Sequence, residues 1–368
     1  MLTVLLLLAV QRVQVTPAPE WDAVFARTRG WTGADGIFTI PLDGNDRAEG
    51  LARTDTLLWF SDTFIGEVLP NGTRRNTVMV NNTTAYLPRG STPSAMEFWY
   101  RQDGEQPVSA FVPDTPNALP GEWYWPHDGV ALDGVVHLFA HRFRRSTEGM
   151  GFARTGLALI SLTAPARPPF AGAVQQDCPF YLPATAQRAE MIFGIGILAN
   201  TLAAGAPMPD GYLYVYGVRE DPFVKKLLCA RVTPEQLTDW TAWRFWNGAA
   251  WDPDPEHSAV LTERVSPELS MTPLSGGRFL LVYQADTISR TIAARVAATP
   301  VGPFGAQVEL YTCPLPAQPG TWTYNAKAHP HLSGPRELLI SYHVNAVDFW
   351  DHFRHADIYR PRFVRLSW

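Results

Sequence analysis

The stretches RGWTGADGIFTIPL (residues 29–42) and LLWFSDTFIGEV (residues 57–68) place two carboxylates in strongly apolar, aromatic surroundings. Asp35 and Asp62 interrupt runs that otherwise have the composition of buried β-strands. Burying a carboxylate costs free energy unless a partner compensates for it. A larger pattern in the chain accounts for both residues.

The same order of features recurs five times along the chain. Each unit has a polar residue, a strand of small residues, a Gly/Asp turn, a strongly apolar strand, a polar tip and a third strand. The units contain ADGIFTIPL (34–42), HDGVALDGVVHLFAHRFR (127–144), FGIGILAN (193–200), PELSMTPLSGGRFLLVYQAD (267–286) and AHPHLSGPRELLISYHVN (328–345). This pattern predicts an all-β fold, a single five-bladed β-propeller over residues 21–368. A β-sandwich is the alternative. Residues 21–29 are expected to close the ring as an outer strand of the last blade.

Composition limits the class of protein. The 368 residues are 46% hydrophobic and 12% aromatic, with a net charge of -5, which indicates a globular chain. The absence of a basic run argues against nucleic-acid binding. An odd number of widely spaced cysteines, Cys178, Cys229 and Cys313, argues against a disulfide framework. One bridge or three free thiols remain open.

The first twenty residues are expected to be a signal peptide or a disordered segment. Residues 2–10 form an apolar run of signal-peptide length, too short to span a bilayer, and a Pro/Ala segment follows it. No Lys or Arg precedes the run, and no clean A-x-A site follows. The expectation is an exported protein, extracellular or periplasmic. A misplaced start codon and a buried N-terminal strand are the alternatives.

The repeat predicts where the polar residues gather. In an antiparallel blade, the start of the first strand and the end of the second meet at one face, with the start of the third. Carboxylates occupy such positions at Asp35, Asp62, Asp128 and Glu268. Glycoside hydrolysis needs one carboxyl as acid and another as base or nucleophile. The predicted catalytic residues are therefore Asp35 as base or nucleophile, with Glu268 or Asp128 as acid. Asp-Gly turns are the alternative for Asp35 and Asp128.

Polar and aromatic residues on the same predicted face are expected to bind the sugar. They are Asp62, Asn82, Trp125, His127, His141, Arg290, Lys327, His329 and Tyr342. Strand-end hydrogen bonding is the alternative for Asp62, and an ordinary buried histidine is the alternative for His329. No cofactor or metal ligand is predicted, because HExxH is absent. A zinc site at HPH (329–331) and a structural calcium in the channel remain open.

The first unit also resembles a known family. GWTGADGIFTIPL, LLWFSDTFIG and VNNT (80–83) resemble the opening of bacterial propellers grouped as domain of unknown function 4185, and of the related domain of unknown function 5005. There W-T-G-G-D-G is followed by W-x-F-G-D-T-F and V-x-N-N, from which Ala34 and Ser61 depart. The later segments PELSMTPL, YNAKAHPHLS and LLISYHVN resemble further blades of the same kind.

This resemblance implies a five-bladed propeller, usually an exported one. It also implies an activity, because some members of the first family are glycoside hydrolases that cut D-arabinan. The layout is more distantly similar to glycoside hydrolase families 43 and 62. By position, Asp35 matches the first-blade acid and Asp128 the second-blade acid. The family 43 general acid comes from the third blade, where this chain has Gly194 and Gly196, with Glu190 a few residues earlier. Glu268 on the fourth blade is then the best substitute.

Together, the residues and the resemblance predict a glycoside hydrolase acting on a furanose-containing, arabinan-like polysaccharide or glycan at the channel mouth. The alternatives are a non-catalytic glycan-binding propeller and a metal-dependent hydrolase propeller, such as a lactonase or phosphoesterase. The expected partner is a poly- or oligosaccharide. A monomer with no nucleic acid and no membrane span is expected.

Overall fold

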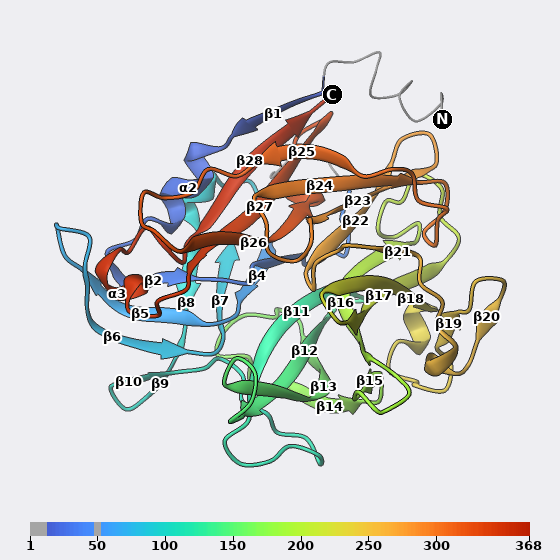
Figure 1. The fold of residues 1–368 in the computed structure, drawn as a ribbon, viewed down its shortest axis with the longest axis horizontal. Helices are drawn as coiled ribbons and strands as arrows, with labels where there is room; N and C mark the ends of the chain where they lie inside the picture. Colours follow the sequence, from blue (N-terminus) through green and yellow to red (C-terminus); the bar gives the residue numbers. More distant parts are fainter. Residues whose placement is uncertain (1–12, 48–52) are drawn as a thin grey trace.

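The computed structural model describes residues 13–47 and 53–368 (Figure 1). The described residues are mostly strands. Their α-helices are α2 (Pro19–Phe25) and α3 (Asp351–Arg354), and their 3-10 turns are η1 (Pro93–Ala95), η2 (Pro234–Gln236), η3 (Pro255–His257) and η4 (Pro330–Leu332). None of the described helices has the length and apolar character that crossing a membrane requires.

Five antiparallel sheets follow one another along the chain. The first sheet contains β3 (Phe38–Pro41), β4 (Thr56–Phe60), β7 (Thr83–Leu87) and β8 (Glu97–Trp99). The second contains β11 (Trp123–Leu132), β12 (Val135–Arg145), β13 (Phe152–Thr163) and β14 (Val174–Cys178). The third contains β15 (Tyr181–Leu182), β16 (Glu190–Asn200), β17 (Tyr212–Asp221), β18 (Val224–Val232), β19 (Arg244–Trp246) and β20 (Trp251–Asp252), and β21 (Thr262–Glu263) pairs with β18.

The fourth sheet contains β22 (Leu269–Leu274), β23 (Arg278–Gln284), β24 (Thr291–Ala297) and β25 (Val308–Thr312). The fifth contains β26 (Thr321–His329), β27 (Glu337–Ala346), β28 (Pro361–Ser367) and β1 (Gln14–Pro17). Two smaller sheets accompany them. One is formed by β2 (Arg29–Ala34), β5 (Thr63–Val68) and β6 (Arg74–Val80), and the other is the hairpin of β9 (Arg101–Asp103) and β10 (Gln106–Val108).

The innermost strands of the five sheets form a ring. β11 packs between β3 and β16, and β22 packs between β16 and β26. The ring closes where Thr39 Oγ1 of β3 and His329 Nδ1 of β26 share a hydrogen bond of 2.9 Å. The molecule is therefore an all-β propeller, as predicted, and its five main sheets are consistent with the predicted number of blades.

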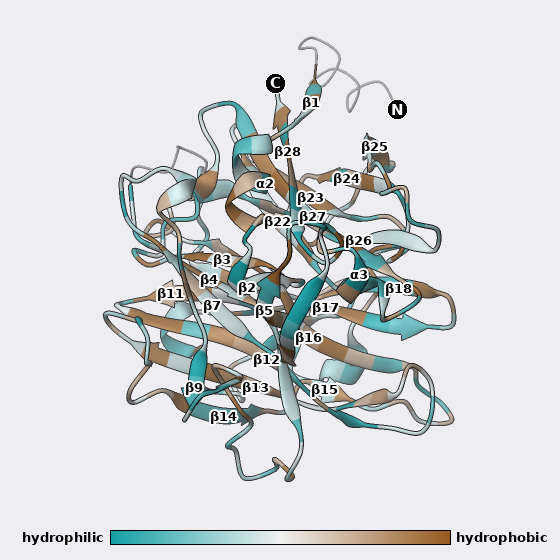
Figure 2. Ribbon diagram, turned by 90° about the vertical axis from the view of Figure 1, so that its left-hand side faces the viewer, coloured by the Kyte–Doolittle hydropathy of each residue, from teal (hydrophilic) through white to brown (hydrophobic). Residues whose placement is uncertain are grey.

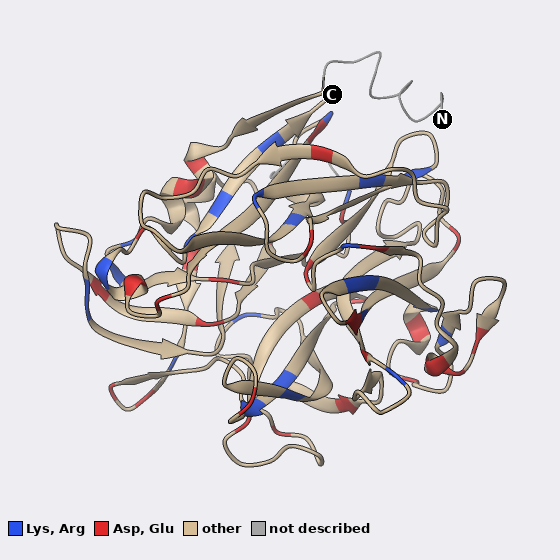
Figure 3. Ribbon diagram, viewed as in Figure 1, with Lys and Arg blue, Asp and Glu red and all other residues tan. Residues whose placement is uncertain are grey.

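Hydrophobic and charged residues occupy different parts of the propeller. Hydrophobic residues lie along the strands, where neighbouring sheets pack against each other (Figure 2). Acidic and basic residues are interspersed over loops and strands (Figure 3). This distribution agrees with a core made of sheet-to-sheet contacts, and with a surface that no single sign of charge dominates.

The ring is closed by a different segment from the predicted one. β1 pairs antiparallel with β28, from Gln14↔Ser367 to Pro17↔Val364, whereas residues 19–25 form helix α2. The expectation of a strand over 21–29 is wrong because Pro19 opens the segment and acidic residues fill its first turn, both of which favour a helix start. β1 also falls within the first twenty residues, for which a leader or a disordered segment was expected. Residues 1–12 lie outside the described residues.

Helix α2 joins the first and fifth sheets. Its residues Trp21 and Phe25 are four apart and share one face. Both are fully buried. The ring of Phe25 lies 5.3 Å from that of Phe363 in β28 of the fifth sheet and 5.7 Å from that of Phe98 in β8 of the first sheet. The helix therefore fills the seam where the two ends of the chain meet.

Removing β1 tests this closure. A chain that begins at Ala18 is expected to unfold at a temperature lower by a few degrees than one that begins at Val13, because the edge of β28 loses its partner strand. Thermal unfolding followed by circular dichroism measures the difference. Equal midpoints for the two chains would show that β1 does not contribute to closing the ring.

Candidate active site

The two opening acids lie side by side at the rim of the first sheet. The Asp35 N–H donates to the carbonyl of Asp62 (3.3 Å), and the Ser61 N–H donates to the carbonyl of Asp35 (2.9 Å). Gly36 follows with a φ of +57°, where a Cβ would lie 2.4 Å from Ser61 Oγ. Glycine is therefore required for the close approach of these two strand ends.

Asp35 is bound by residues from the other end of the chain. Its Oδ2 accepts a hydrogen bond of 2.6 Å from the Tyr324 hydroxyl on β26. Its Oδ1 is buried and has no hydrogen-bond partner among the described residues. Burial raises the pKa of Asp35 to about 6, and Tyr324, Tyr359 and Lys327 oppose that rise. An unpartnered buried oxygen of this kind is available to a ligand or a water.

Asp62 is held by the first and second sheets. Its Oδ1 accepts hydrogen bonds from Asn81 Nδ2 (3.0 Å) and from Trp125 Nε1 (2.8 Å). Burial raises the pKa of Asp62 to about 7, and the negative charge of Asp35 adds to the rise. Near neutral pH, the two carboxyls therefore titrate as a coupled pair that retains a proton more readily than exposed aspartates do.

Glu268 brings a third carboxyl toward this pair. It directly precedes β22, and it forms an ion pair and hydrogen bond with Lys327 Nζ of β26. Both side chains are buried, and Lys327 Nζ lies 4.2 Å from the ring centroid of Phe38. Burial raises the pKa of Glu268 to about 7 against the lowering effect of Lys327, and the charge of Asp35 adds to the rise. Lys327 is therefore a cation that Glu268 and Asp35 share.

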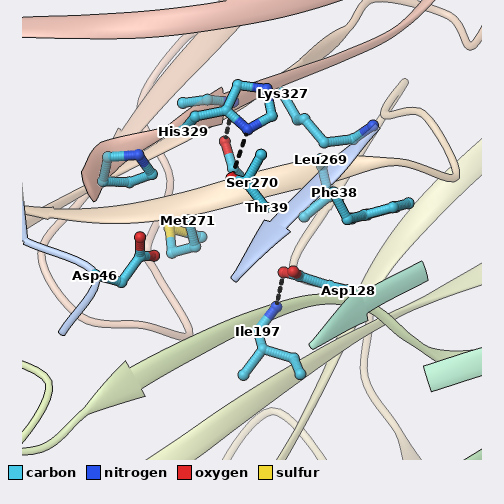
Figure 4. Close-up of a pocket in the computed structure, with 12 residues that line it drawn as sticks. Phe38, Thr39, Asp46, Asp128, Ile197, Leu269, Ser270, Met271, Lys327 and His329 are labelled. Atoms are coloured by element: carbon cyan, nitrogen blue, oxygen red, sulfur yellow. Dashed lines mark hydrogen bonds between the residues drawn. The ribbon is translucent and has the colours of Figure 1, made fainter. Parts of the chain in front are cut away.

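Asp128 lies in a different part of the channel. Its Oδ1 accepts from Gly129 N (2.9 Å) and its Oδ2 from Ile197 N (2.7 Å). It lines a narrow cavity with Asp46, Lys327 and His329 (Figure 4). Burial raises its pKa to about 7, and its charged neighbours are Asp46 and Lys327 rather than Asp35 or Asp62. A bulge in β11 between Pro126 and Gly129 separates Asp128 from Trp125, which does reach Asp62.

Four of the predicted sugar-binding residues make hydrogen bonds or packing contacts within the protein. Asn82 bonds the backbone of Phe111 and Tyr124. Arg290 Nε donates to the carbonyl of Cys313. Both ring nitrogens of His329 are hydrogen-bonded, and the buried Tyr342 packs beside Tyr311. These contacts support the fold and do not bring the four side chains to Asp35 or Asp62.

Two histidines of the second sheet, His127 and His141, lie against each other. The ring centroids of His127 and His141 are 3.5 Å apart, and His141 Nε2 lies 3.2 Å from the carbonyl of Phe193. Burial lowers the pKa of both imidazoles well below the ordinary value. Among residues 13–47 and 53–368, no group of three or more His, Cys, Asp or Glu side chains is arranged to hold a metal ion.

Two contacts of Asp35 were missed by the sequence analysis. Tyr324 lies within the segment YNAKAHPHLS, where a bulge between Tyr324 and Lys327 interrupts the pairing of β26 with β27. Tyr359 has a φ of +67° and follows helix α3. Neither tyrosine follows a periodic pattern, and aromatic residues are frequent throughout the chain. Only the ring closure brings them to the first sheet.

The raised carboxyl pKa values predict how stability depends on pH. The folded protein holds the Asp62 proton more tightly than the unfolded chain, so this contribution is present below about pH 4 and is lost as pH rises through about 7. Asp62→Asn keeps an oxygen for Asn81 and Trp125 but carries no charge. We expect the variant to be more stable than the wild type at pH 8, by about 1.4 kcal/mol for each unit by which the pKa is raised.

Urea unfolding at pH 5 and pH 8 measures this effect. Asp103→Asn, in the exposed β9–β10 hairpin, is the matched control and should keep the pH dependence of the wild type. An Asp62→Asn variant with unchanged pH dependence would contradict the assignment.

The fold resembles those of other known structures. A protein of Bacteroides ovatus that carries the provisional description of hydrolase is similar with a TM-score of 0.74 and 19% identity, over 96% of this chain and 90% of its own. An alpha-L-arabinofuranosidase of Podospora anserina, solved with cellotriose, has a TM-score of 0.47 and 11% identity, over 92% and 97% of the two chains. A GH43_1 enzyme of Xanthomonas citri, solved with xylose, has a TM-score of 0.48 and 15% identity, over 95% and 93%.

The first likeness supports the fold alone, and the other two are too distant to carry an argument. No curated protein matches the sequence. A family model, however, matches residues 19–368, nearly the whole described chain. Of the two families that the first-blade motifs resemble, the match confirms domain of unknown function 5005. It does not confirm domain of unknown function 4185. The chain belongs to the family described as Domain of unknown function (DUF5005).

Proposed function

We propose that this protein is a glycoside hydrolase acting on a furanose-containing, arabinan-like glycan. One observation carries the proposal: Asp35 and Asp62 are adjacent at one rim, and burial raises the pKa of both carboxyls toward neutral pH, while the charge of Asp35 raises that of Asp62 further. Paired titratable groups with different pKa values are the arrangement that acid–base catalysis uses. The unpartnered Oδ1 of Asp35 is the atom best suited to a reacting water or sugar carbon.

Asp35 is the proposed base or nucleophile. Its ionised form is supported by the hydroxyl of Tyr324 and by the positive charge of Lys327. Asp62 is the proposed proton donor, because both of its hydrogen bonds from protein groups go to Oδ1 and because burial and the charge of Asp35 raise its pKa. Glu268 is already paired with Lys327, so it is not the proposed proton donor.

Asp128 is not part of this proposed pair, although the sequence suggested it as an acid. Both of its carboxyl oxygens accept backbone N–H bonds, and neither belongs to the Asp35–Asp62 contact. Its role in this proposal is to hold the backbone of Gly129 and Ile197 where the second and third sheets meet.

Aromatic side chains flank the acids on two sides. The ring of Trp125 lies 4.3 Å from that of Phe143 and 4.7 Å from that of Phe152. On the fifth sheet, Trp322 and Tyr324 have ring centroids 4.5 Å apart. Aromatic faces of this kind stack on the apolar faces of sugar rings. The arabinan-like substrate rests on the resemblance of the first-blade motifs, and export of the protein remains a prediction.

The test is incubation with a panel of arabinans, galactans and xylans, with product analysis by chromatography. The wild type is expected to release sugars from at least one arabinan. Asp35→Asn should lower kcat by about 10²–10⁴-fold, as for loss of an acid–base group, whereas the exposed Asp103→Asn should not. Binding to a glycan without products would favour a non-catalytic glycan-binding propeller instead.

The pH profile gives a second prediction. kcat/KM should be bell-shaped, with its maximum between about pH 6 and pH 7, because Asp35 must be ionised and Asp62 protonated. Tyr324→Phe removes a donor that lowers the Asp35 pKa, so the acidic limb should move to higher pH. Tyr342→Phe makes the same change at a buried tyrosine of the fifth sheet that packs beside Tyr311, and it should leave the profile in place. An unmoved acidic limb in Tyr324→Phe would remove Asp35 from the assignment.

A further inference from the structure

The loop Val347–His355 connects the end of β27 to the segment before β28, and it contains helix α3. Its aromatic residues Phe349 and Trp350 are exposed to 46% and 61%. His352, in contrast, is only 3% exposed and points to the candidate site. This histidine is the link between an exposed aromatic loop and the buried acids.

A chain of hydrogen bonds runs from His352 to Asp35. His352 Nε2 lies 2.8 Å from Asn345 Oδ1, Asn345 Nδ2 donates to the Tyr324 hydroxyl (3.1 Å), and Tyr324 donates to Asp35 (2.6 Å). The orientation of the Asn345 amide is set by the Ala346 N–H, which donates to Asn345 Oδ1 (2.8 Å). That oxygen is therefore an acceptor, and His352 Nε2 must carry a proton to bond it.

The second ring nitrogen faces an acceptor as well. His352 Nδ1 lies 2.8 Å from the carbonyl oxygen of Phe349, which cannot donate. A neutral imidazole has one N–H and can satisfy only one of the two acceptors. The geometry around His352 therefore fits the imidazolium form, with a proton on each nitrogen.

The surroundings of His352 determine when this form exists. Arg74 of β6 donates to the His352 carbonyl, and Asp348 and Asp351 lie on the same loop. The rings of Tyr359 and Phe64 pack at 4.9 Å and 5.9 Å. Burial lowers the pKa of His352, and Arg74 adds to this, while the Phe349 carbonyl and the two aspartates oppose it. The doubly protonated form consequently belongs to acidic pH.

We propose that His352 is a positioning residue that, by donating from both ring nitrogens at acidic pH, fastens the loop Val347–His355 to the Asn345–Tyr324–Asp35 chain. Each donor in this chain points toward Asp35, so the protonated ring polarises the Tyr324 hydroxyl and strengthens its bond to the carboxylate. Loss of one proton breaks one of the two side-chain hydrogen bonds of His352, which loosens the loop, although Arg74 and the ring of Phe64 still contact it. The catalytic consequence rests on the proposed function, but the attachment of the loop does not.

Hydrogen exchange tests the attachment directly. Protection of the amides of residues 349–355, corrected for the intrinsic exchange rate, should be roughly five- to tenfold higher at pH 5 than at pH 8, as expected for one hydrogen bond. His352→Gln cannot donate to both acceptors, so its loop should be less protected and independent of pH. His355→Gln is the matched control on the same segment, where the histidine contacts Gln318, and it should behave as the wild type. Protection that is equal at the two pH values in the wild type, or retained in His352→Gln, would overturn the proposal.

Activity supplies a second readout that a purely structural role would not move. On a substrate that the wild type cleaves, His352→Gln should shift the acidic limb of kcat/KM to higher pH, whereas His355→Gln should not. A superimposable His352→Gln profile would overturn the link to Asp35. If the wild type cleaves no glycan, the proposed function fails, and the exchange experiment still decides whether His352 fastens the loop.

Discussion

Closure of the ring is the constraint on which the rest of this molecule depends. The fifth sheet must pack against the first, and the chain achieves this with β1 beside β28 and with α2 in the seam. The same contact carries the Tyr324–Asp35 hydrogen bond and the Thr39–His329 hydrogen bond. Closure removes the sheet edges that would otherwise be exposed. It also gives Asp35, beside the first sheet, a hydrogen-bond donor from the fifth sheet, the Tyr324 hydroxyl.

The electrostatics of the site follow from this crowding. Asp35 and Glu268 share the influence of one buried cation, Lys327, whose direct partner is Glu268, whereas Asp62 is affected by the charge of Asp35. Burial without a full set of partners raises the pKa of each carboxyl, which makes a proton available near neutral pH. Buried carboxyls without a full set of partners lower the stability of the fold, and this loss of stability is typical of functional sites. The acids are therefore better explained by chemistry than by packing.

Local patterns predicted the architecture because each blade repeats its own hydrophobic alternation. They also placed Asp35 and Asp62 at one rim, since the ends of paired strands are neighbours whatever surrounds them. The pattern was less reliable in predicting which of two neighbouring residues faces the site. Asn81, not its neighbour Asn82, contacts Asp62, because successive side chains point to opposite faces.

Other features lie beyond any local pattern. The bulge in β11 sends Asp128 to the cavity near Asp46, although Asp-Gly recurs in the first and second units. The segment 21–29 was expected to be an outer strand because the ring needs a closing segment, whereas the Pro19 start and the spacing of Trp21 and Phe25 produce a helix. Tyr324 is 289 residues from Asp35, and only the closed ring brings the two together.

This distance along the chain has a consequence for synthesis. Residues 29–68 leave the ribosome early with both acids in place, but Asp35 then has neither Tyr324 nor Lys327. In a partly made chain, Asp35 and Asp62 are therefore both present, but the groups that give Asp35 a different environment from Asp62 are not. On this view, Asp35 acquires the groups that distinguish it from Asp62 only after the fifth sheet has been made and β28 has paired with β1.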